Sequence, residues 1–269
     1  MGSYTIECVL DCKNHLGEGP VWDHERGMLY WLDCTGNRVR NPTVWRLDPR
    51  TGQVRHWFIN RDVGAMALRA RGGAMLAAND GFYTFDFDTG ATERVRSVNT
   101  ANGRARLNDG KCDRLGRFFS GGMDDKEELA LCSLWRKEMW AYDYDIASGS
   151  LSNRRVFRDL RHDAGFADGS TVDAEGCVWN ARVIAGELVR YAPDGTVDRV
   201  IGMPVRNITS VIFGGDKLDE IYVTSMARVS HPAAHEHFVA EQKPQFAAGA
   251  LFRIKGLGIK GLAEPYFAG

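Results

Sequence analysis

The sequence lacks three features that would place it in a specialised class of protein. Its 269 residues contain no apolar run near the roughly 18 residues of a membrane-spanning helix. An excess of charge of one sign is also missing, because 34 Lys and Arg stand against 35 Asp and Glu. That balance excludes the net positive charge typical of proteins that bind nucleic acid or an anionic membrane surface. No basic segment precedes an apolar one near the N-terminus, so no signal peptide is predicted and we expect a cytoplasmic protein.

Linkers, cysteine-based metal sites and a serine nucleophile motif are lacking as well. No Pro- or Ser-rich spacer, low-complexity tract or shift in composition divides the chain, so we expect one domain over residues 1–269. Cys8 and Cys12 are four residues apart, but no second pair completes a zinc site among the six cysteines. Most of the six fall in predicted strands, where a free thiol behaves as a small apolar side chain, so we expect reduced cysteines. No Gly-x-Ser-x-Gly sequence occurs, which argues against a serine hydrolase elbow.

What the chain does contain is two hairpin patterns that recur. The first has two apolar residues, a polar turn with Gly and an apolar run; the second has an apolar segment followed by Asp-x-x-x-Gly or a variant. The first pattern occurs at residues 21–33, 66–77, 111–121, 171–181 and 211–224, and the second at 44–54, 82–92, 139–151, 187–197 and 250–259. Self-similarity at about 40–45 residues predicts an all-β propeller in which two hairpins make one four-stranded blade.

The spacing of the repeats is irregular at one point. The interval between the first-pattern hairpins at residues 111 and 171 is too long for one blade. For the second pattern one interval is too short, because an incomplete copy at residues 133–136 (SLWR) is followed almost at once by the copy at residue 139. We interpret this as blades three and four being fused or truncated, with roughly 30 residues absent near Arg136–Lys137.

Polar residues stand just before or at the start of three first-pattern hairpins, where a propeller opens into its channel. They are Glu18 in HLGEGPVWD, Asn108 and Asp109 in RLNDGK, and Asp168 in FADGSTVD. Because each occupies the same place in its repeat, we expect them to converge on the axis. Carboxylate and carboxamide oxygens suit a divalent cation, which can polarise a carbonyl and lower the pKa of bound water. The alternative is that Glu18 and Asp168 only accept backbone N–H groups at tight glycine turns.

Two further clusters are weaker candidates for a metal site. Residues 231–237 (HPAAHEH) could bind a metal through His231 and His235, but no third ligand is indicated and a polar loop tolerates His freely. Asp143 and Asp145 are spaced as in a calcium loop, but its later positions lack oxygen ligands. A similar segment at residues 48–52 indicates that this is a repeated turn.

At these motifs the sequence resembles a known family, the SMP-30/gluconolactonase/regucalcin-like sugar-lactone hydrolases. The segments that carry the resemblance are LGEGPVWD, RLNDGKCDRLGRFFSGGM, SNRRVF, DGSTVDAEGCVWNA, ITSVIFGG, IYVTS and GALFRIKGLGIKGLAEPYFAG, in order along nearly the whole chain. The resemblance implies a six-bladed β-propeller with one divalent metal ion near the axis: calcium, zinc, magnesium, manganese or iron. It also implies hydrolysis of a small sugar lactone, such as gluconolactone, to its aldonic acid.

Carried over residue by residue, the resemblance implies roles for four residues. Glu18 matches a metal ligand, and Asp168 matches the carboxylate that binds the metal and is placed to act as general base. Arg106 and Asn108 match the residues expected to hold the substrate. The family's remaining ligand, an Asn in a segment resembling SNG-x-x-x-SPDG, has no match here. Two interpretations stay open: a lactonase weakened by the loss of one ligand, and a non-catalytic or cation-binding propeller that has lost its active site.

Overall fold

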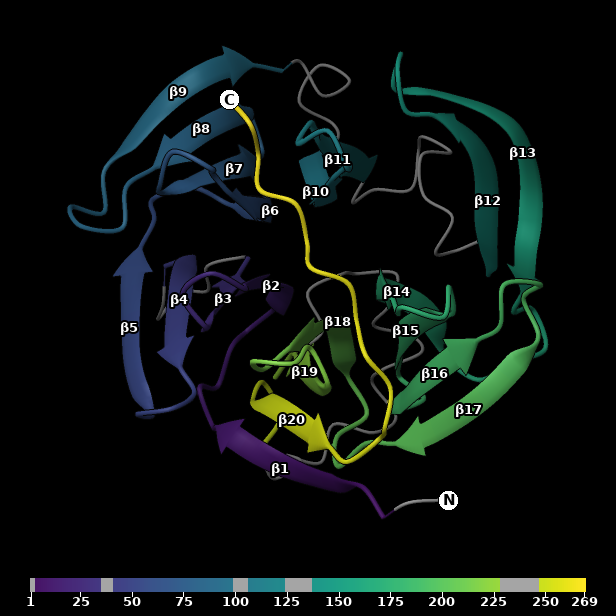
Figure 1. The fold of residues 1–269 in the computed structure, drawn as a ribbon. Coiled ribbons are helices and arrows are strands. Elements are labelled where there is room, and N and C mark those ends of the chain that lie inside the picture. Colours follow the sequence, from purple (N-terminus) through teal and green to yellow (C-terminus); the bar gives the residue numbers. More distant parts are fainter. Residues whose placement is uncertain (1–2, 35–40, 99–105, 124–136, 228–246) are drawn as a thin grey trace.

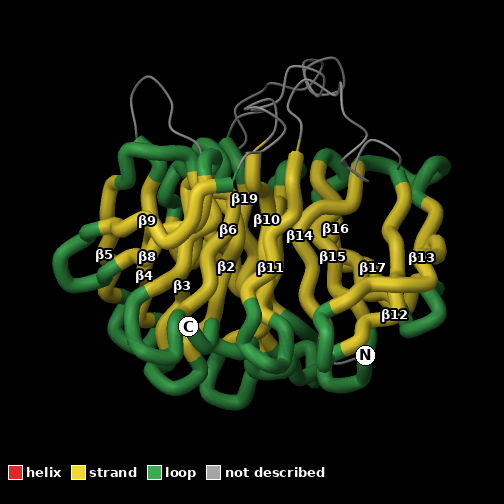
Figure 2. The backbone as a smooth tube through the Cα atoms, turned by 90° about the horizontal axis from the view of Figure 1, so that it is seen from above, coloured by secondary structure: helices red, strands yellow, loops and turns green. Residues whose placement is uncertain are grey.

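Every regular element in the described part of the chain is a β-strand. The computed structural model describes residues 3–34, 41–98, 106–123, 137–227 and 247–269. These residues form twenty strands, and none of them forms a helix that could cross a membrane. The strands make six sheets around a common centre (Figure 1). In the view turned by 90° they stand side by side with loops at both ends (Figure 2). The all-β prediction is confirmed.

Four of the sheets have four antiparallel strands each. The first contains β2 (Gly17–Asp23), β3 (Met28–Asp33), β4 (Thr43–Asp48) and β5 (Gln53–Phe58). The second contains β6 (Val63–Leu68), β7 (Ala74–Ala78), β8 (Gly81–Phe85) and β9 (Thr92–Ser97). The third contains β14 (Phe166–Val172), β15 (Val178–Val183), β16 (Glu187–Tyr191) and β17 (Val197–Gly202). The fourth contains β18 (Ile208–Gly214), β19 (Glu220–Ser225), β20 (Leu251–Lys255) and β1 (Thr5–Leu10), so it joins the two ends of the chain.

The other two sheets have two strands each. β10 (Arg106–Cys112) pairs with β11 (Phe118–Met123) close to the centre, and β12 (Glu138–Asp145) pairs with β13 (Ser150–Asp159) at the outer edge (Figure 1). These pairs occupy the place of the predicted irregular blades three and four. In the described residues they are separate sheets rather than one fused sheet, and the predicted gap at Arg136–Lys137 begins at the edge of the described segment.

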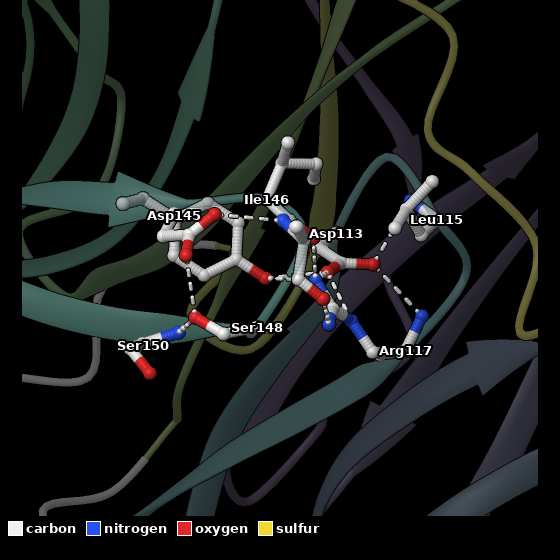
Figure 3. A network of polar contacts seen from close by, with 9 residues as sticks. Asp113, Leu115, Arg117, Asp145, Ile146, Ser148 and Ser150 are labelled. Carbon is white, nitrogen blue, oxygen red and sulfur yellow. Dashed lines mark hydrogen bonds and ion pairs between the residues drawn. The ribbon is translucent and has the colours of Figure 1, made fainter.

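Side chains tie the two short sheets together (Figure 3). Arg117, just before β11, donates to the carbonyl oxygens of Ile146 (2.5 Å) and Ala147 (3.2 Å) in the turn after β12. Asp113 pairs with Arg117 (2.5 Å) and also accepts a hydrogen bond from the Tyr144 hydroxyl. The outer pair is therefore anchored to the inner pair through polar contacts between their turns.

The core lies toward the inner strands. All residues of β6, β7 and β18 are buried, whereas most of β9 and β17, on the outer side, are exposed. The innermost strands pack against one another in the order β10, β6, β2, β18, β14. Five cysteines are free thiols, and Cys132 lies outside the described residues.

The C-terminal segment after β20 crosses the centre of one face (yellow in Figure 1). This strap, residues 256–269, forms hydrogen bonds with residues at or just after the C-terminal ends of the inner strands. Its contacts include Tyr266 Oη to Asp23 Oδ1 (2.7 Å), Phe267 N to Leu68 O (2.7 Å), Ala268 N to Gly116 O (2.9 Å), Ala174 N to Lys260 O (2.8 Å) and Gly261 N to Leu218 O (2.8 Å). Because inner strands end at this face and begin at the other, the strap lies opposite the predicted site.

Candidate functional site

Every innermost strand carries the same irregularity near its start, a shift in its register with the next strand. The shifts fall between Glu18 and Val21, Val63 and Ala65, Asn108 and Gly110, Ala167 and Ser170, and Ile208 and Ser210. Such β-bulges bend the strand, re-aim side chains and are frequent beside active sites. The predicted site residues Glu18, Asn108 and Asp168 all lie at these breaks, in three different sheets.

Four charged side chains at these breaks share one electrostatic neighbourhood. Burial raises the pKa of Glu18 well above its usual range, and the charges of Asp168 and Asp109 raise it further, while the Gly19 N–H and Arg106 oppose the shift. Burial also raises the pKa of Asp168, with Asp109 adding to the effect and Arg106 opposing it. The charges of Asp109, Asp168 and Arg106 affect Glu18, so the four side chains lie within electrostatic range of one another near the start of the inner strands.

The predicted substrate-binding pair is in direct contact. Arg106 Nη1 donates to Asn108 Oδ1 at 2.5 Å, and Asn108 Nδ2 donates to Asp109 Oδ2 at 3.2 Å. Asp109 has a φ of 47°, in the left-handed region, which the bulge in β10 requires. Arg106 and Asn108 are half-buried and present polar groups beside the two carboxylates.

The alternative, in which Glu18 and Asp168 only accept backbone N–H groups at glycine turns, is supported by two contacts. It does not explain why Glu18 is buried. Glu18 Oε2 accepts a hydrogen bond from Gly19 N at 3.1 Å, and a backbone N–H at Gly169 lowers the pKa of Asp168. A carboxylate that only caps a turn can stay exposed, whereas Glu18 is only 7% exposed. Burying like charges together is costly and is characteristic of functional sites.

The site offers two carboxylates, Glu18 and Asp168, as ligands for a metal ion. In the part of the chain that the structure describes, no three His, Cys, Asp or Glu side chains gather closely enough to hold a metal. Glu18 and Asp168 nevertheless have the hard oxygen atoms that divalent cations prefer. Their raised pKa values mean that the charged forms are disfavoured, and a bound cation would reverse this. The residues fit such an ion in kind, with the remaining positions left to water or substrate.

The calcium-loop candidate forms a turn. Asp145 accepts the N–H of Ala147 (2.9 Å) and the hydroxyl of Ser148 (2.7 Å), so the predicted turn is confirmed (Figure 3). Asp48 and Asp86 bond their own turns in the same way. His231 and His235 lie outside the described residues.

The sequence analysis missed Asn180, in β15. This side chain is 0% exposed, and its Nδ2 donates to the main-chain oxygen of Asp168 at 2.6 Å and to Ser170 Oγ at 2.9 Å. Its neighbours Trp179 and Ala181 are buried in the core. The sequence feature that could have indicated Asn180 is an amide residue within the otherwise apolar segment VWNA.

Comparisons with known proteins agree with these motifs. A model of the family described as "SMP-30/Gluconolactonase/LRE-like region" matches residues 16–131 and 125–227. Regucalcin from Xenopus laevis is 30% identical over 311 residues, covering 100% of both chains. A 6-deoxy-6-sulfogluconolactonase from Pseudomonas putida is 30% identical over 302 residues, covering 98% of this chain and 99% of the relative. The crystal structure of a calcium-binding protein, regucalcin, from Agrobacterium tumefaciens has a TM-score of 0.84 at 22% identity, covering 98% of this chain and 97% of that one.

These comparisons also bear on the irregular repeat. The alignment with the Xenopus laevis protein spans 311 residues, more than the 269 of this chain, so that relative contains residues without a counterpart here. The two stretches matched by the family model meet at residues 125–131, close to the predicted gap. Both observations agree with an internal segment that this chain lacks.

Proposed function

The chain belongs to the SMP-30/gluconolactonase/LRE-like family, and we propose that it hydrolyses a sugar lactone to the aldonic acid with the help of one divalent metal ion. The observation that carries the proposal is that Glu18, which is buried, and Asp168, which is half-buried, come from two sheets and lie within electrostatic range of each other and of Arg106. The Pseudomonas putida relative is named as a gluconolactonase, and the Agrobacterium tumefaciens structure is titled calcium-binding. Both names support this choice of substrate class and ion.

In the proposed mechanism Asp168 acts as the general base. Its carboxylate takes a proton from water as the water oxygen attacks the lactone carbonyl carbon. The ring C–O bond then breaks, and the ring oxygen takes up that proton from Asp168 to give the hydroxy acid. Glu18 and Asp168 would hold the ion, which when bound supplies polarisation of the carbonyl and a lower pKa for water. Base catalysis of this kind typically contributes about 10²–10⁴-fold to the rate.

Arg106 and Asn108 orient the sugar in this proposal. Arg106 lies within electrostatic reach of Glu18 and Asp168 and contacts Asn108, so both side chains stand beside the reacting groups. Guanidinium and amide N–H groups are donors suited to hydroxyl and ring oxygens of a sugar.

We further propose that the ring has six blades, two of them incomplete. In this arrangement β10–β11 is the inner half of blade three, and β12–β13 is the outer half of blade four. The central place of the first pair and the outer place of the second support this assignment (Figure 1). The greater length of the relatives agrees with it.

The direct test is hydrolysis of gluconolactone by the chain, measured with added Mn²⁺ or Ca²⁺ and after treatment with a chelator. We expect turnover that depends on the ion and that is lost on chelation and restored by adding the ion back. Turnover that persists unchanged in the chelator would refute the metal-assisted mechanism.

A second candidate is a propeller that binds a divalent cation without turnover. It is favoured by the finding that the described site offers two carboxylates rather than three clustered ligands. Calorimetric titration with the same ions separates the candidates, because binding without hydrolysis of any aldonolactone supports the second one.

A further inference from the structure

We propose that Asn180 is a positioning residue that holds the main chain of Asp168 at the bulge of β14. The inference rests on the proposed function for the role of Asp168 itself. Asn180 does not touch the reacting atoms in this view. It acts by determining where the Asp168 carboxylate lies relative to Glu18.

The contacts of Asn180 span the bulge. Its Nδ2 donates to the Asp168 main-chain oxygen at 2.6 Å and to Ser170 Oγ at 2.9 Å, and Ser170 Oγ also contacts that oxygen at 3.3 Å. The register shift between Ala167 and Ser170 removes Asp168 from regular pairing with β15. A side chain on β15 therefore supplies a partner at the point where the strand ladder is interrupted.

A similar hydrogen bond from a side chain to a main-chain oxygen occurs at the other two bulges that carry candidate site residues. Ser120 Oγ, on β11, donates to the main-chain oxygen of Asp109 at 2.9 Å. Thr209 Oγ1, on β18, donates to the main-chain oxygen of Gly17, next to Glu18. At all three bulges, a side chain from a neighbouring strand thus binds a carbonyl within one residue of a candidate site residue.

Asn180 differs from Ser120 and Thr209 because part of it is unsatisfied. Its Oδ1 is buried and has no hydrogen-bond partner in the described residues. A buried acceptor without a partner costs about 1–3 kcal/mol. The amide is therefore better explained by the two hydrogen bonds that its Nδ2 donates at the bulge than by the hydrogen bonding of the whole side chain.

The test compares three variants with the wild-type chain. Asn180→Leu removes the donor at nearly constant size, and Asn180→Ser retains a hydroxyl donor of the kind that Ser120 provides. Ile201→Ala is the control, because Ile201 is buried in the same sheet but lies on β17, at the opposite edge from β14, and its apolar cluster includes no residue of 166–172. Three quantities are measured: the melting temperature, the affinity for Mn²⁺, and hydrogen exchange of residues 166–172 in metal-free protein.

We expect Asn180→Leu to exchange faster at residues 166–172 and to bind Mn²⁺ about 10–100-fold more weakly, the usual effect of removing a group that orients a ligand. Asn180→Ser should recover most of the affinity. Ile201→Ala should melt lower because of its cavity yet keep wild-type exchange at residues 166–172 and wild-type affinity.

Unchanged exchange at residues 166–172 in Asn180→Leu would overturn the positioning role, as would an Ile201→Ala variant with the same local and binding defects. If the wild-type chain binds no Mn²⁺, the proposed function fails, and the exchange data still decide the role of Asn180. Faster exchange in Asn180→Leu, reversed in Asn180→Ser, would then support positioning of Asp168 without a metal.

Discussion

At the scale of single residues, the site gathers carboxylates that repel one another. Burial and neighbouring charge raise the pKa of both Glu18 and Asp168. A group whose pKa is raised on folding contributes stability at low pH, and this contribution is lost as the pH rises through the folded-state value. Near neutral pH, ionising these two groups therefore lowers the stability of the metal-free fold, and a bound cation would offset that loss.

Replacing Asp168 by Asn tests both consequences. We expect lactone hydrolysis to fall by about 10²–10⁴-fold, because the general base is lost. The metal-free variant should melt at least as high as wild type at pH 7, because one buried charge is removed from the neighbourhood of Glu18. The measurements are the hydrolysis rate with excess Mn²⁺ and the melting temperature in chelator.

The control for this variant is Asp194→Asn. Asp194 lies in an exposed turn, where it accepts the N–H and the hydroxyl of Thr196. The Asp194→Asn substitution should leave the hydrolysis rate unchanged. An Asp168→Asn variant with wild-type hydrolysis would contradict the assignment of the base.

Asp173 illustrates a buried charge with a structural role. It is 0% exposed and accepts hydrogen bonds from Arg190 Nε (2.8 Å), Trp179 Nε1 (2.9 Å) and Cys177 N (3.0 Å). Burial pushes the pKa of Asp173 upward, but these hydrogen bonds outweigh it and hold the pKa below its usual range. Its carboxylate therefore stabilises the fold above the unfolded-state pKa, and this stability is lost as the pH falls through the lower folded-state value.

We expect Asp173→Asn to lower the free energy of unfolding by about 1.5–3 kcal/mol, because Arg190 loses its buried charge partner and keeps only Glu175 and Asp198, which are more exposed. Urea unfolding at pH 7 measures this loss. The difference from wild type should shrink in acid, below the unfolded Asp pKa of about 3.9. A loss at pH 7 no larger than that of Asp194→Asn would show that the pair contributes little.

At the scale of elements, the C-terminal strap links the ends of the inner strands. Tyr266 donates to Asp23 at the end of β2, and main-chain bonds of Phe267 and Ala268 reach Leu68 and Gly116. These contacts lie far apart in sequence and on the face opposite the site. The strap should therefore contribute to stability and leave catalysis unaffected.

Tyr266→Phe isolates one strap contact. A hydrogen bond to a charged group is worth about 1.5–3 kcal/mol, so we expect unfolding free energy to fall by roughly that amount, with metal affinity unchanged. The matched control is Tyr142→Phe, since Tyr142 is exposed on β12 and should have no effect. A loss of metal affinity in Tyr266→Phe would contradict the separation between strap and site.

The elements differ in how far the sequence predicted them. Hairpin patterns at residues 21–33 and 187–197 coincide with β2–β3 and β16–β17, because alternation and turn residues are local signals. The bulges were not predicted, since a register shift exists only relative to the next strand. The strap was not predicted either, because its hydrogen bonds join residues about 200 positions apart, as with Ala70 and Phe267.

Within the site, the same limit applies to Asn180. The motifs around Glu18, Arg106, Asn108 and Asp168 could be found because they stand at equivalent places in the repeats. Asn180 lies on the following strand, and its role depends on a carbonyl that the bulge in β14 leaves unpaired. Only the folded arrangement of the two strands brings these groups together.

At the scale of the whole molecule, the arrangement of sheets around the centre is irregular between β10 and β14. The strap residue Glu264 reaches both strands there, accepting from Lys111 Nζ at 3.1 Å and from Thr171 Oγ1 at 3.5 Å. The hydrogen bonds from Arg117 to the turn after β12 lie in the same sector. Side-chain contacts thus connect sheets that have only two strands each among the described residues.

Inserting a family-like blade-four segment between Arg136 and Lys137 tests this description. Among the described residues, β11 and β12 each pair with a strand on one side only, and none of their residues is fully buried. New strands would pair with these edges and cover their side chains. Burying one apolar side chain contributes about 1.5–3 kcal/mol, which matters against a typical margin of about 5–15 kcal/mol. The segment would also return an Asn ligand, so we expect a higher melting temperature and metal affinity about 10–100-fold tighter.

The control is a Gly/Ser insertion of equal length at the same point, because loop length alone changes closure entropy only slightly. It should raise neither quantity. A Gly/Ser variant that matched the family-like insertion would assign the gain to relief of a short connection rather than to strand pairing. If the chain as it stands melts as high and binds Mn²⁺ as tightly as the family-like insertion variant, then Glu264 and Arg117 already close the sector. In that case two carboxylates suffice for the ion, and the loss of the segment removed neither a structural nor a catalytic requirement.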